Sequence, residues 1–243
     1  MEKIFFVLPA YNEEANIEKT IRQWYPVVEN AGKDCRLVIA NDGSKDGTFK
    51  MMESLKDKYP LLIPLDKPNQ GHGPTVIYLY RYAIENGATY IFQTDSDGQT
   101  NPAEFQQFLD SIEEYDCVMG ARPVRGDGKS RKIVENVLRS YVWLFFRVWV
   151  PDANAPFRLM KSSVVEKYLN VMPSDFNLPN AVLAACFSKF KEKVKYIDIT
   201  FRPRQGGINS INLKKIFKIG YKAISDFYKI KQNVKNLYQY GSN

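Results

Sequence analysis

Histidine, cysteine and long apolar runs are all scarce in this chain of 243 residues, and each shortage excludes a class of protein. His72 is the only histidine, and the three cysteines, Cys35, Cys117 and Cys186, lie far apart in the sequence. Structural zinc sites and disulfide frameworks need several such residues at close or paired spacing. We therefore expect buried thiols in a reducing compartment and no zinc site.

No apolar run is long enough to cross a bilayer as a helix, which takes about 20 residues. The most apolar later stretch covers residues 142–150 and is interrupted by Arg147. The run at residues 4–8 ends at Pro9 and is too short for a signal peptide. The sequence therefore predicts a cytoplasmic protein, either free or bound peripherally at the cytoplasmic face of a membrane.

Positive charge is in excess, because 34 lysines and arginines face 27 aspartates and glutamates, for a formal net charge of +7. An excess of this sign suits anionic partners, such as nucleotide phosphates, an anionic membrane surface or nucleic acid. The length, and a hydrophobic fraction of 44%, fit one globular core. We expect a single domain with a tail.

Short apolar runs alternate with segments of helical period in the first half of the chain. We expect strands at residues 4–8, 37–40, 61–65 and 90–94, and helices at residues 48–58, 75–86 and 102–113. An earlier helix is expected to be capped by Asn12 and to bury a stripe that starts at Ile17. Strands that alternate with crossover helices predict a mainly parallel sheet covered on both faces.

The order is looser after Gly120. The pattern predicts a basic loop at residues 122–131, an aromatic helix at 133–149, a short strand at 157–160, two helices, a strand at 194–202 and a basic amphipathic helix from 209 to about 237. We therefore divide the chain into a domain at residues 1–210 and a C-terminal basic helix and tail at residues 211–243.

Polar segments follow the first two predicted strands, at residues 9–14 and 41–48. In a parallel α/β sheet, ligands bind beyond the carboxyl ends of the strands, beside helix N-termini that favour anions. Either segment is therefore suited to hold part of a nucleotide. The alternative is that Asn12 and Ser44 cap helices and that Gly43 makes a tight turn.

Asp95 and Asp97 stand at the end of the most apolar central strand, with one residue between them. Two carboxylates at this spacing can converge on one hard cation, so we expect Mg²⁺ or Mn²⁺ bridging a diphosphate. A turn followed by a helix cap at Asn101 explains part of the same pattern.

These segments together resemble the family 2 glycosyltransferases over residues 3–210. The matching motifs are Pro-x-Tyr-Asn-Glu (9–13), Asp-Gly-Ser-x-Asp-Gly-Thr (42–48), Asn-x-Gly-x-Gly (69–73), the Asp-x-Asp pair, Gly-Ala-Arg (120–122) and Arg-x-x-Gly-x-x-Ser (204–210). The resemblance implies an α/β fold of GT-A type, a Rossmann-like three-layer fold with a mainly parallel central sheet. It also implies a nucleotide-diphosphate-sugar donor.

The resemblance also implies roles for individual residues. Those expected around the base and ribose are Pro9, Tyr11, Glu13 and Asp42. Asp95 and Asp97 serve the metal and diphosphate, and Arg122 and Arg204 are candidates for phosphate or sugar contacts. One departure is Asn41, where many relatives have an aspartate, and it leaves the identity of the base open.

A second departure concerns the acceptor. No carboxylate occurs between Asp175 and Glu192, around the Phe-Asn-Leu-Pro-Asn segment at residues 176–180, near where polysaccharide-forming relatives place a general base. A hydroxyl acceptor normally needs such a base, whereas a lipid phosphate is already anionic. We therefore favour a polyprenyl-phosphate acceptor, as in dolichyl-phosphate mannose synthase-like relatives, over a saccharide. Asp152 and Asp175 remain possible bases, although Asp175 is also placed to cap a helix.

Two segments have the composition of membrane-interfacial elements: the aromatic helix around residues 141–149, with Arg139 and Arg147, and the basic final helix. The alternative is that both pack on the sheet and leave their charges in water. Peripheral membrane contact is thus one expected interaction, and no nucleic acid is expected.

The resulting prediction is an inverting, metal-dependent glycosyltransferase that works by direct displacement at the anomeric carbon. A phosphatase of the haloacid dehalogenase type is the rival enzyme, since Asp95 would suit an aspartyl nucleophile. A non-catalytic nucleotide- or RNA-binding protein is the third possibility.

Overall fold

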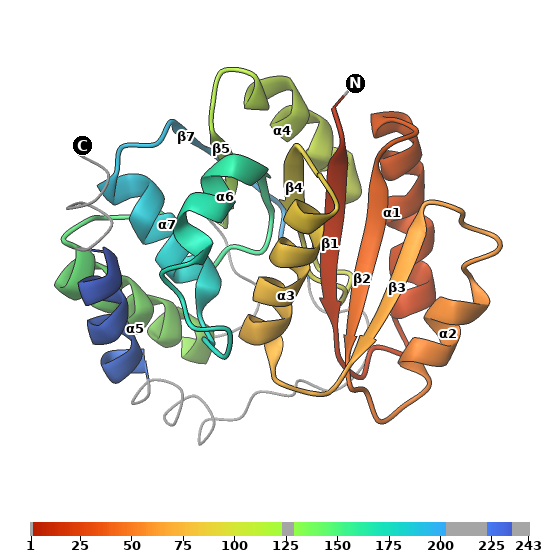
Figure 1. The fold of residues 1–243 in the computed structure, drawn as a ribbon, viewed down its shortest axis with the longest axis horizontal. Coiled ribbons are helices and arrows are strands. Elements are labelled where there is room, and N and C mark those ends of the chain that lie inside the picture. The colour runs from red at the N-terminus through yellow and green to blue at the C-terminus, as the bar shows by residue number, and fades with distance from the viewer. Residues whose placement is uncertain (1, 123–128, 203–222, 235–243) are drawn as a thin grey trace.

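A seven-stranded sheet runs through the centre of the computed structural model, which describes residues 2–122, 129–202 and 223–234 (Figure 1). The strands are β1 (Ile4–Ala10), β2 (Arg36–Asp42), β3 (Leu62–Lys67), β4 (Tyr90–Gln93), β5 (Cys117–Ala121), β6 (Arg158–Lys161) and β7 (Val194–Asp198). Their order is β3-β2-β1-β4-β6-β5-β7. Only β6 pairs antiparallel with its neighbours among these strands, so the predicted mainly parallel sheet is confirmed.

Helices cover both faces of the sheet and make the three predicted layers. They are α1 (Ile17–Ala31), α2 (Thr48–Ser54), α3 (His72–Glu85), the 3-10 turn η1 (Pro102–Glu104), α4 (Phe105–Ile112), α5 (Lys129–Phe146), α6 (Ser162–Leu169) and α7 (Pro179–Lys189). Residues 223–234 are also helical. The core on one face includes α1, α2 and α4, and the core on the other includes α3, α5, α6, α7 and residues 223–234.

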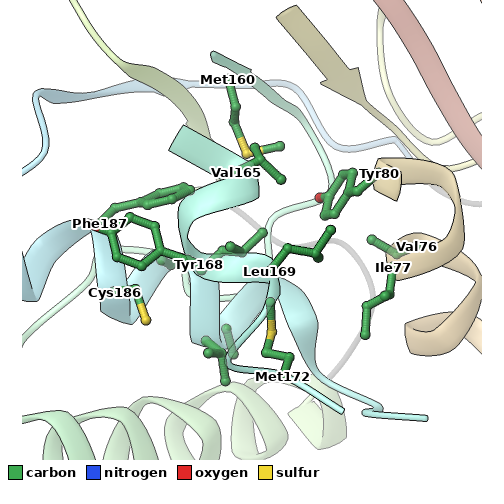
Figure 2. Close-up of a cluster of buried hydrophobic side chains, with 14 of the residues drawn as sticks. Val76, Ile77, Tyr80, Met160, Val165, Tyr168, Leu169, Met172, Cys186 and Phe187 are labelled. Carbon is green, nitrogen blue, oxygen red and sulfur yellow. The ribbon is translucent and has the colours of Figure 1, made fainter. Parts of the chain in front are cut away.

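The two cores follow from the alternation of side chains along each strand. Phe92 of β4 packs on one face against Trp24 and Phe6, with ring centroids 5.2 and 5.3 Å away. Ile91, one residue earlier, belongs to the opposite core. Figure 2 shows that second core, where Tyr80 of α3 and Tyr168 of α6 lie in one cluster with side chains of α7.

The connection from β5 to β6 leaves and re-enters the sheet at the same edge. Met119 of β5 and Gln93 of β4 both pair with Arg158, the first residue of β6. Because β6 starts where β5 ends, α5 and the loop after it stay beside the carboxyl edge of the sheet. This reversal was not predicted from the sequence.

Several predicted helix boundaries were wrong. Asn12 does not cap α1, which begins at Ile17; it has a φ of 54°, and its side-chain oxygen accepts a hydrogen bond from the Lys45 N–H at 2.9 Å. α3 begins at His72 instead of residue 75, because a proline is tolerated in the first turn of a helix. α5 ends at Phe146, since the next residue has a φ of 58°.

The C-terminal helix packs on the domain where the structure describes it. Phe227 is fully buried, with ring centroids 5.8 Å from Phe145 and 5.9 Å from Phe146. The side chain of Asn233 donates to the Val171 carbonyl at 3.0 Å. The predicted domain boundary at residue 210 lies outside the described residues and stays a prediction. Among the described helices, none is long and apolar enough to cross a membrane.

Candidate active site

The carboxyl ends of the parallel strands meet at one edge of the sheet. Tyr11 follows β1, Asp42 ends β2, Asp95 follows β4 and Arg122 follows β5. These strands all run in the same direction, since β6 reverses between β4 and β5. The structure therefore brings the predicted polar segments to a common edge, as expected for an open α/β sheet.

Hydrogen bonds join the loops after β1 and β2. The N–H of Asn12 donates to Oγ of Ser44 at 2.9 Å, and the N–H of Glu13 donates to Oγ1 of Thr48 at 2.9 Å. Glu13 is buried, and its Oε2 accepts from the side chain of Asn16 at 2.7 Å. Buried Pro9 and half-buried Tyr11 thus lie where braced loops leave the ends of β1 and β2.

The carboxylate of Asp42 is held from three sides. Its Oδ1 accepts from Nζ of Lys67 at 2.6 Å and from the N–H of Gln70 at 2.9 Å, and its Oδ2 accepts from the N–H of Gly71 at 2.8 Å. Asp42 thereby ties β2 to the turn that begins α3. Lys67 was not predicted, although it is the register partner of Asp42 on the adjacent strand.

The Asp95–Asp97 loop is fixed to β1 and α1 by its middle residue. Oγ of Ser96 donates to the Pro9 carbonyl at 2.8 Å, and the Ser96 carbonyl accepts from Oγ1 of Thr20 at 2.9 Å. Oδ1 of Asp97 accepts from the N–H of Gln99 at 3.1 Å. The two carboxylates are thus carried on an ordered turn at the end of β4.

The Asp95 side chain has the property expected of a cation ligand. Within the described part of the chain, its Oδ1 is buried and has no hydrogen-bond partner. A buried, unpaired carboxylate oxygen is costly unless a ligand satisfies it. No group of three or more His, Cys, Asp or Glu side chains that could hold a metal is found among residues 2–122, 129–202 and 223–234. The pair therefore fits a hard cation that takes its other ligands from a bound anion or water.

Arg122 and Asp152, predicted for different roles, form a bidentate ion pair. Nε of Arg122 lies 2.7 Å from Oδ2 of Asp152, and Nη2 lies 2.9 Å from Oδ1. The Arg122 guanidinium also lies over the Phe201 ring, 4.9 Å from its centroid. Both charged side chains are buried, so the pair anchors the β5–β6 connection at the edge.

A buried polar cluster lies behind the site and was missed by sequence reasoning. Oη of Tyr80 lies 2.7 Å from Oε1 of Gln93 and 3.1 Å from Oδ1 of Asn180. Arg158 is fully buried and donates to the carbonyls of Ala155 at 2.7 Å and Asn180 at 3.1 Å. Burial raises the pKa of Tyr80 and lowers the pKa of Arg158. The polar Gln93 inside an apolar strand was the available signal.

The segment before α7 packs tightly on the start of α3. A Cβ atom added to Gly73 would lie 2.4 Å from the Phe176 carbonyl oxygen, so only glycine permits this approach. Asp175 does not cap α7, because that helix begins at Pro179 with Leu178 at the cap position. Asp175 instead lines a cavity of about 350 Å³ on the flank of α3, together with Gln70, Pro74, Ile77, Tyr78, Arg81 and Ser174. Arg204 lies outside the described residues.

The layered sheet with polar residues gathered at its carboxyl edge is the architecture of GT-A glycosyltransferases. Glucosyl-3-phosphoglycerate synthase from Mycobacterium tuberculosis, crystallised with Mn²⁺, UDP and phosphoglyceric acid, has a similar fold. The TM-score is 0.70 at 17% sequence identity, over 95% of this chain and 78% of that one. The predicted GT-A fold is thereby confirmed.

The chain belongs to glycosyl transferase family 2, whose sequence model matches residues 5–169. One similar relative is the undecaprenyl-phosphate 4-deoxy-4-formamido-L-arabinose transferase of Proteus mirabilis, 21% identical over 93% of this chain and 68% of that protein. Another is the polyprenol monophosphomannose synthase of Mycolicibacterium smegmatis, 23% identical over 68% of this chain and 64% of that protein. The predicted glycosyltransferase class and the resemblance to polyprenyl-phosphate sugar synthases are confirmed, which rules out the phosphatase alternative.

Proposed function

We propose that this glycosyltransferase takes a sugar from a nucleoside-diphosphate sugar and passes it to a polyprenyl phosphate, with inversion at the anomeric carbon. The observation that carries the proposal is the buried Oδ1 of Asp95, which lacks a hydrogen-bond partner among the described residues. It lies in the same turn as Asp97, at the edge where nucleotides bind in open α/β sheets.

Asp95 and Asp97 are the residues that would hold Mg²⁺ or Mn²⁺ together with oxygens of the donor diphosphate. When bound, such an ion neutralises the charge that develops on the departing nucleoside diphosphate. Support comes from the similarly folded synthase, which was crystallised with Mn²⁺ and UDP. The choice between the two ions belongs to the proposal.

Pro9, Tyr11, Glu13 and Asp42 are proposed to surround the base and ribose. The hydrogen bonds between the loops after β1 and β2 support this, because a braced surface binds a planar ligand without ordering cost. Asp42 has most of its acceptor capacity engaged by Lys67 and the turn before α3. We infer that Asp42 contributes mainly by positioning that turn.

The acceptor is proposed to be a lipid phosphate because neither Asp152 nor the segment at residues 176–180 supplies a general base of the kind a hydroxyl acceptor needs. Both oxygens of Asp152 face the guanidinium of Arg122, which stabilises the ionised carboxylate and weakens it as a base. The segment at residues 176–180 has no carboxylate. The names of two relatives, an undecaprenyl-phosphate transferase and a polyprenol monophosphomannose synthase, point to the same acceptor class.

In the proposed reaction an oxygen of the acceptor phosphate attacks the anomeric carbon from the face opposite the nucleotide. The bond from that carbon to the diphosphate oxygen breaks as the new bond forms, so the nucleoside diphosphate leaves and the configuration inverts. No proton has to be removed from an ionised acceptor. Arg122 and Arg204 are proposed to contact phosphate or sugar, and Arg122 has N–H groups beyond the two that bind Asp152.

A lipid acceptor requires the protein to reach a membrane surface. We therefore propose a cytoplasmic protein that binds the cytoplasmic face of the membrane peripherally. The positive net charge of +7 supports contact with anionic lipids.

The test is release of free nucleotide from UDP-, GDP- and dTDP-sugars with Mn²⁺ or Mg²⁺, with and without a short polyprenyl phosphate. We expect one donor to give metal-dependent release that the lipid phosphate stimulates, and that Asp97→Asn abolishes. Release stimulated by a saccharide but not by the lipid phosphate would contradict the acceptor proposal. A product that keeps the donor's anomeric configuration would contradict direct displacement.

A further inference from the structure

The solvent side of α5 and the turn after it carry exposed apolar side chains. Trp149 is 65% exposed, Trp143 51%, Leu144 48% and Val137 43%. The opposite side of α5 is already buried in the core through Leu138, Val142 and Phe146. The fold therefore does not need the exposed set, which with Arg147 we call the aromatic face.

Arginine and tryptophan are paired on the aromatic face. The guanidinium of Arg147 lies 4.7 Å from the ring centroid of Trp143, and that of Arg139 lies 5.4 Å from the ring centroid of Trp149. Residues 136–151 contain these two arginines and no carboxylate. Arg139 also pairs with Glu135, 2.6 Å away, so Arg147 supplies the positive charge of the aromatic face. Amphipathic rings next to an arginine are typical of segments that lie in the interface of an anionic bilayer.

The aromatic face lies next to the candidate active site. Nη2 of Arg139 donates to the Pro151 carbonyl at 2.7 Å, and the following residue, Asp152, is paired with Arg122 at the end of β5. In Figure 1, α5 lies at the level of the lower, carboxyl ends of the strands. A surface held by the aromatic face would therefore lie beside the edge where a lipid phosphate has to enter.

We propose that the aromatic face docks this protein on the surface of an anionic lipid bilayer. The inference rests on the proposed function in one respect, since docking places the active site where a lipid-phosphate acceptor is found. The positive charge of Arg147, which lies over the exposed ring of Trp143, suits anionic headgroups and selects this occupant. Trp143, Leu144 and Trp149 insert at the headgroup level, while Arg147 pairs with lipid phosphates.

The test is co-sedimentation of the full chain with vesicles of phosphatidylcholine alone or mixed with phosphatidylglycerol, at low and high salt. We expect binding to the mixed vesicles that weakens with salt. The double variant Trp143→Ser/Trp149→Ser should bind roughly tenfold more weakly or worse, because it loses buried apolar area. Arg147→Gln should bind roughly fivefold more weakly, the effect of one basic residue near an anionic surface.

Tyr78→Ser is the matched control, because Tyr78 is a partly exposed aromatic residue on α3, away from the aromatic face. It should bind vesicles as the wild type does. Leu144→Glu provides a second disruption that leaves both tryptophans in place. Wild-type binding by both the double variant and Leu144→Glu would overturn the proposal. The proposal would also be overturned if the wild-type chain did not bind anionic vesicles but self-associated through Trp143 and Trp149 in sedimentation velocity.

Transfer to a short polyprenyl phosphate in solution separates this inference from the proposed function. If docking is the role of the aromatic face, the double variant keeps wild-type transfer to that acceptor and loses transfer to an acceptor embedded in vesicles. If the wild type transferred sugar to no lipid phosphate, the acceptor assignment would be refuted. Vesicle binding would still test the docking proposal in that case. Equal transfer by the wild type and the double variant to the embedded acceptor would overturn the docking proposal.

Discussion

Arg122 and Asp152 close the connection between β5 and β6 with a buried, two-bond ion pair. The pair joins the residue that follows β5 to the loop that leads into β6, so α5 and the aromatic face are held at the carboxyl edge. The same contact turns a candidate base into the partner of a cation. This ion pair therefore affects the acceptor chemistry, because it engages Asp152, and it also fixes the position of the aromatic face.

Breaking this pair should destabilise the protein. Arg122→Met leaves Asp152 charged and buried without its counter-ion, and we expect a loss of about 3 kcal/mol in the free energy of unfolding. Denaturant titration measures it. The double variant Arg122→Met/Asp152→Leu should recover part of the loss. If Asp152→Asn abolished transfer with no loss of stability, Asp152 would be acting as a base after all.

Lys67 should contribute as much to the stability of the protein as the site residues that were predicted from the sequence. Its side chain is 8% exposed and that of Asp42 is 4% exposed, so Lys67→Met leaves the buried carboxylate of Asp42 without its counter-ion. We expect a loss of about 3 kcal/mol in unfolding free energy. Arg22→Met, which breaks the exposed Arg22–Glu18 pair, is the control and should cost less than about 1 kcal/mol. Equal effects of the two variants would contradict the role given to Lys67.

Gly73→Ala should disturb the packing of α3 against the segment before α7. The new methyl group would meet backbone, the Phe176 carbonyl oxygen at 2.4 Å, so the backbone has to move. We expect a loss of about 2 kcal/mol, read from thermal or denaturant unfolding. Gln70→Ala in the same turn keeps the backbone hydrogen bond to Asp42 and should unfold like the wild type. An unchanged midpoint for Gly73→Ala would show that the contact is looser than described.

Asp116 should give the fold a dependence on acid pH. Burial raises its pKa, but hydrogen bonds from the Lys193 N–H and from Lys161 outweigh burial and lower the pKa overall. A depressed folded-state pKa contributes stability above the ordinary aspartate value of about 3.9, and this stability is lost as the pH falls through the folded-state pKa. Asp116→Asn should therefore be less stable than the wild type at pH 7, and the difference should vanish in strong acid. A difference that persists in acid would assign the effect to packing.

The sequence predicted the features that depend on local pattern. Alternating apolar runs and helical segments indicated the sheet and its layers, and the strand-end positions of Asp42 and Asp95 indicated the edge where they lie. The Asp95–Asp97 spacing is also local, and the metal-binding role predicted from it stays a prediction.

Contacts between residues far apart in the chain could not be predicted. The Arg122–Asp152 pair, the Lys67–Asp42 pair and the Asn12–Lys45 hydrogen bond each depend on how loops from different strands meet. Asn12 is the clearest example. Its neighbours in the sequence suit a helix cap, but its side chain binds the Lys45 N–H on another loop instead. The direction of β6 could not be predicted either, because it depends on pairing with β4 and β5 and not on the residues of β6 itself.

The central claim is that Asp95 and Asp97 bind a divalent ion together with the donor diphosphate. The measurement is Mn²⁺ binding followed by electron paramagnetic resonance, in the presence of UDP, GDP or dTDP, for the wild type, Asp95→Asn, Asp97→Asn and the control Asp116→Asn. We predict that one nucleotide promotes Mn²⁺ binding by the wild type and the control, and that both site variants lose it. Wild-type Mn²⁺ binding by both Asp95→Asn and Asp97→Asn, with the same nucleotide, would contradict the claim.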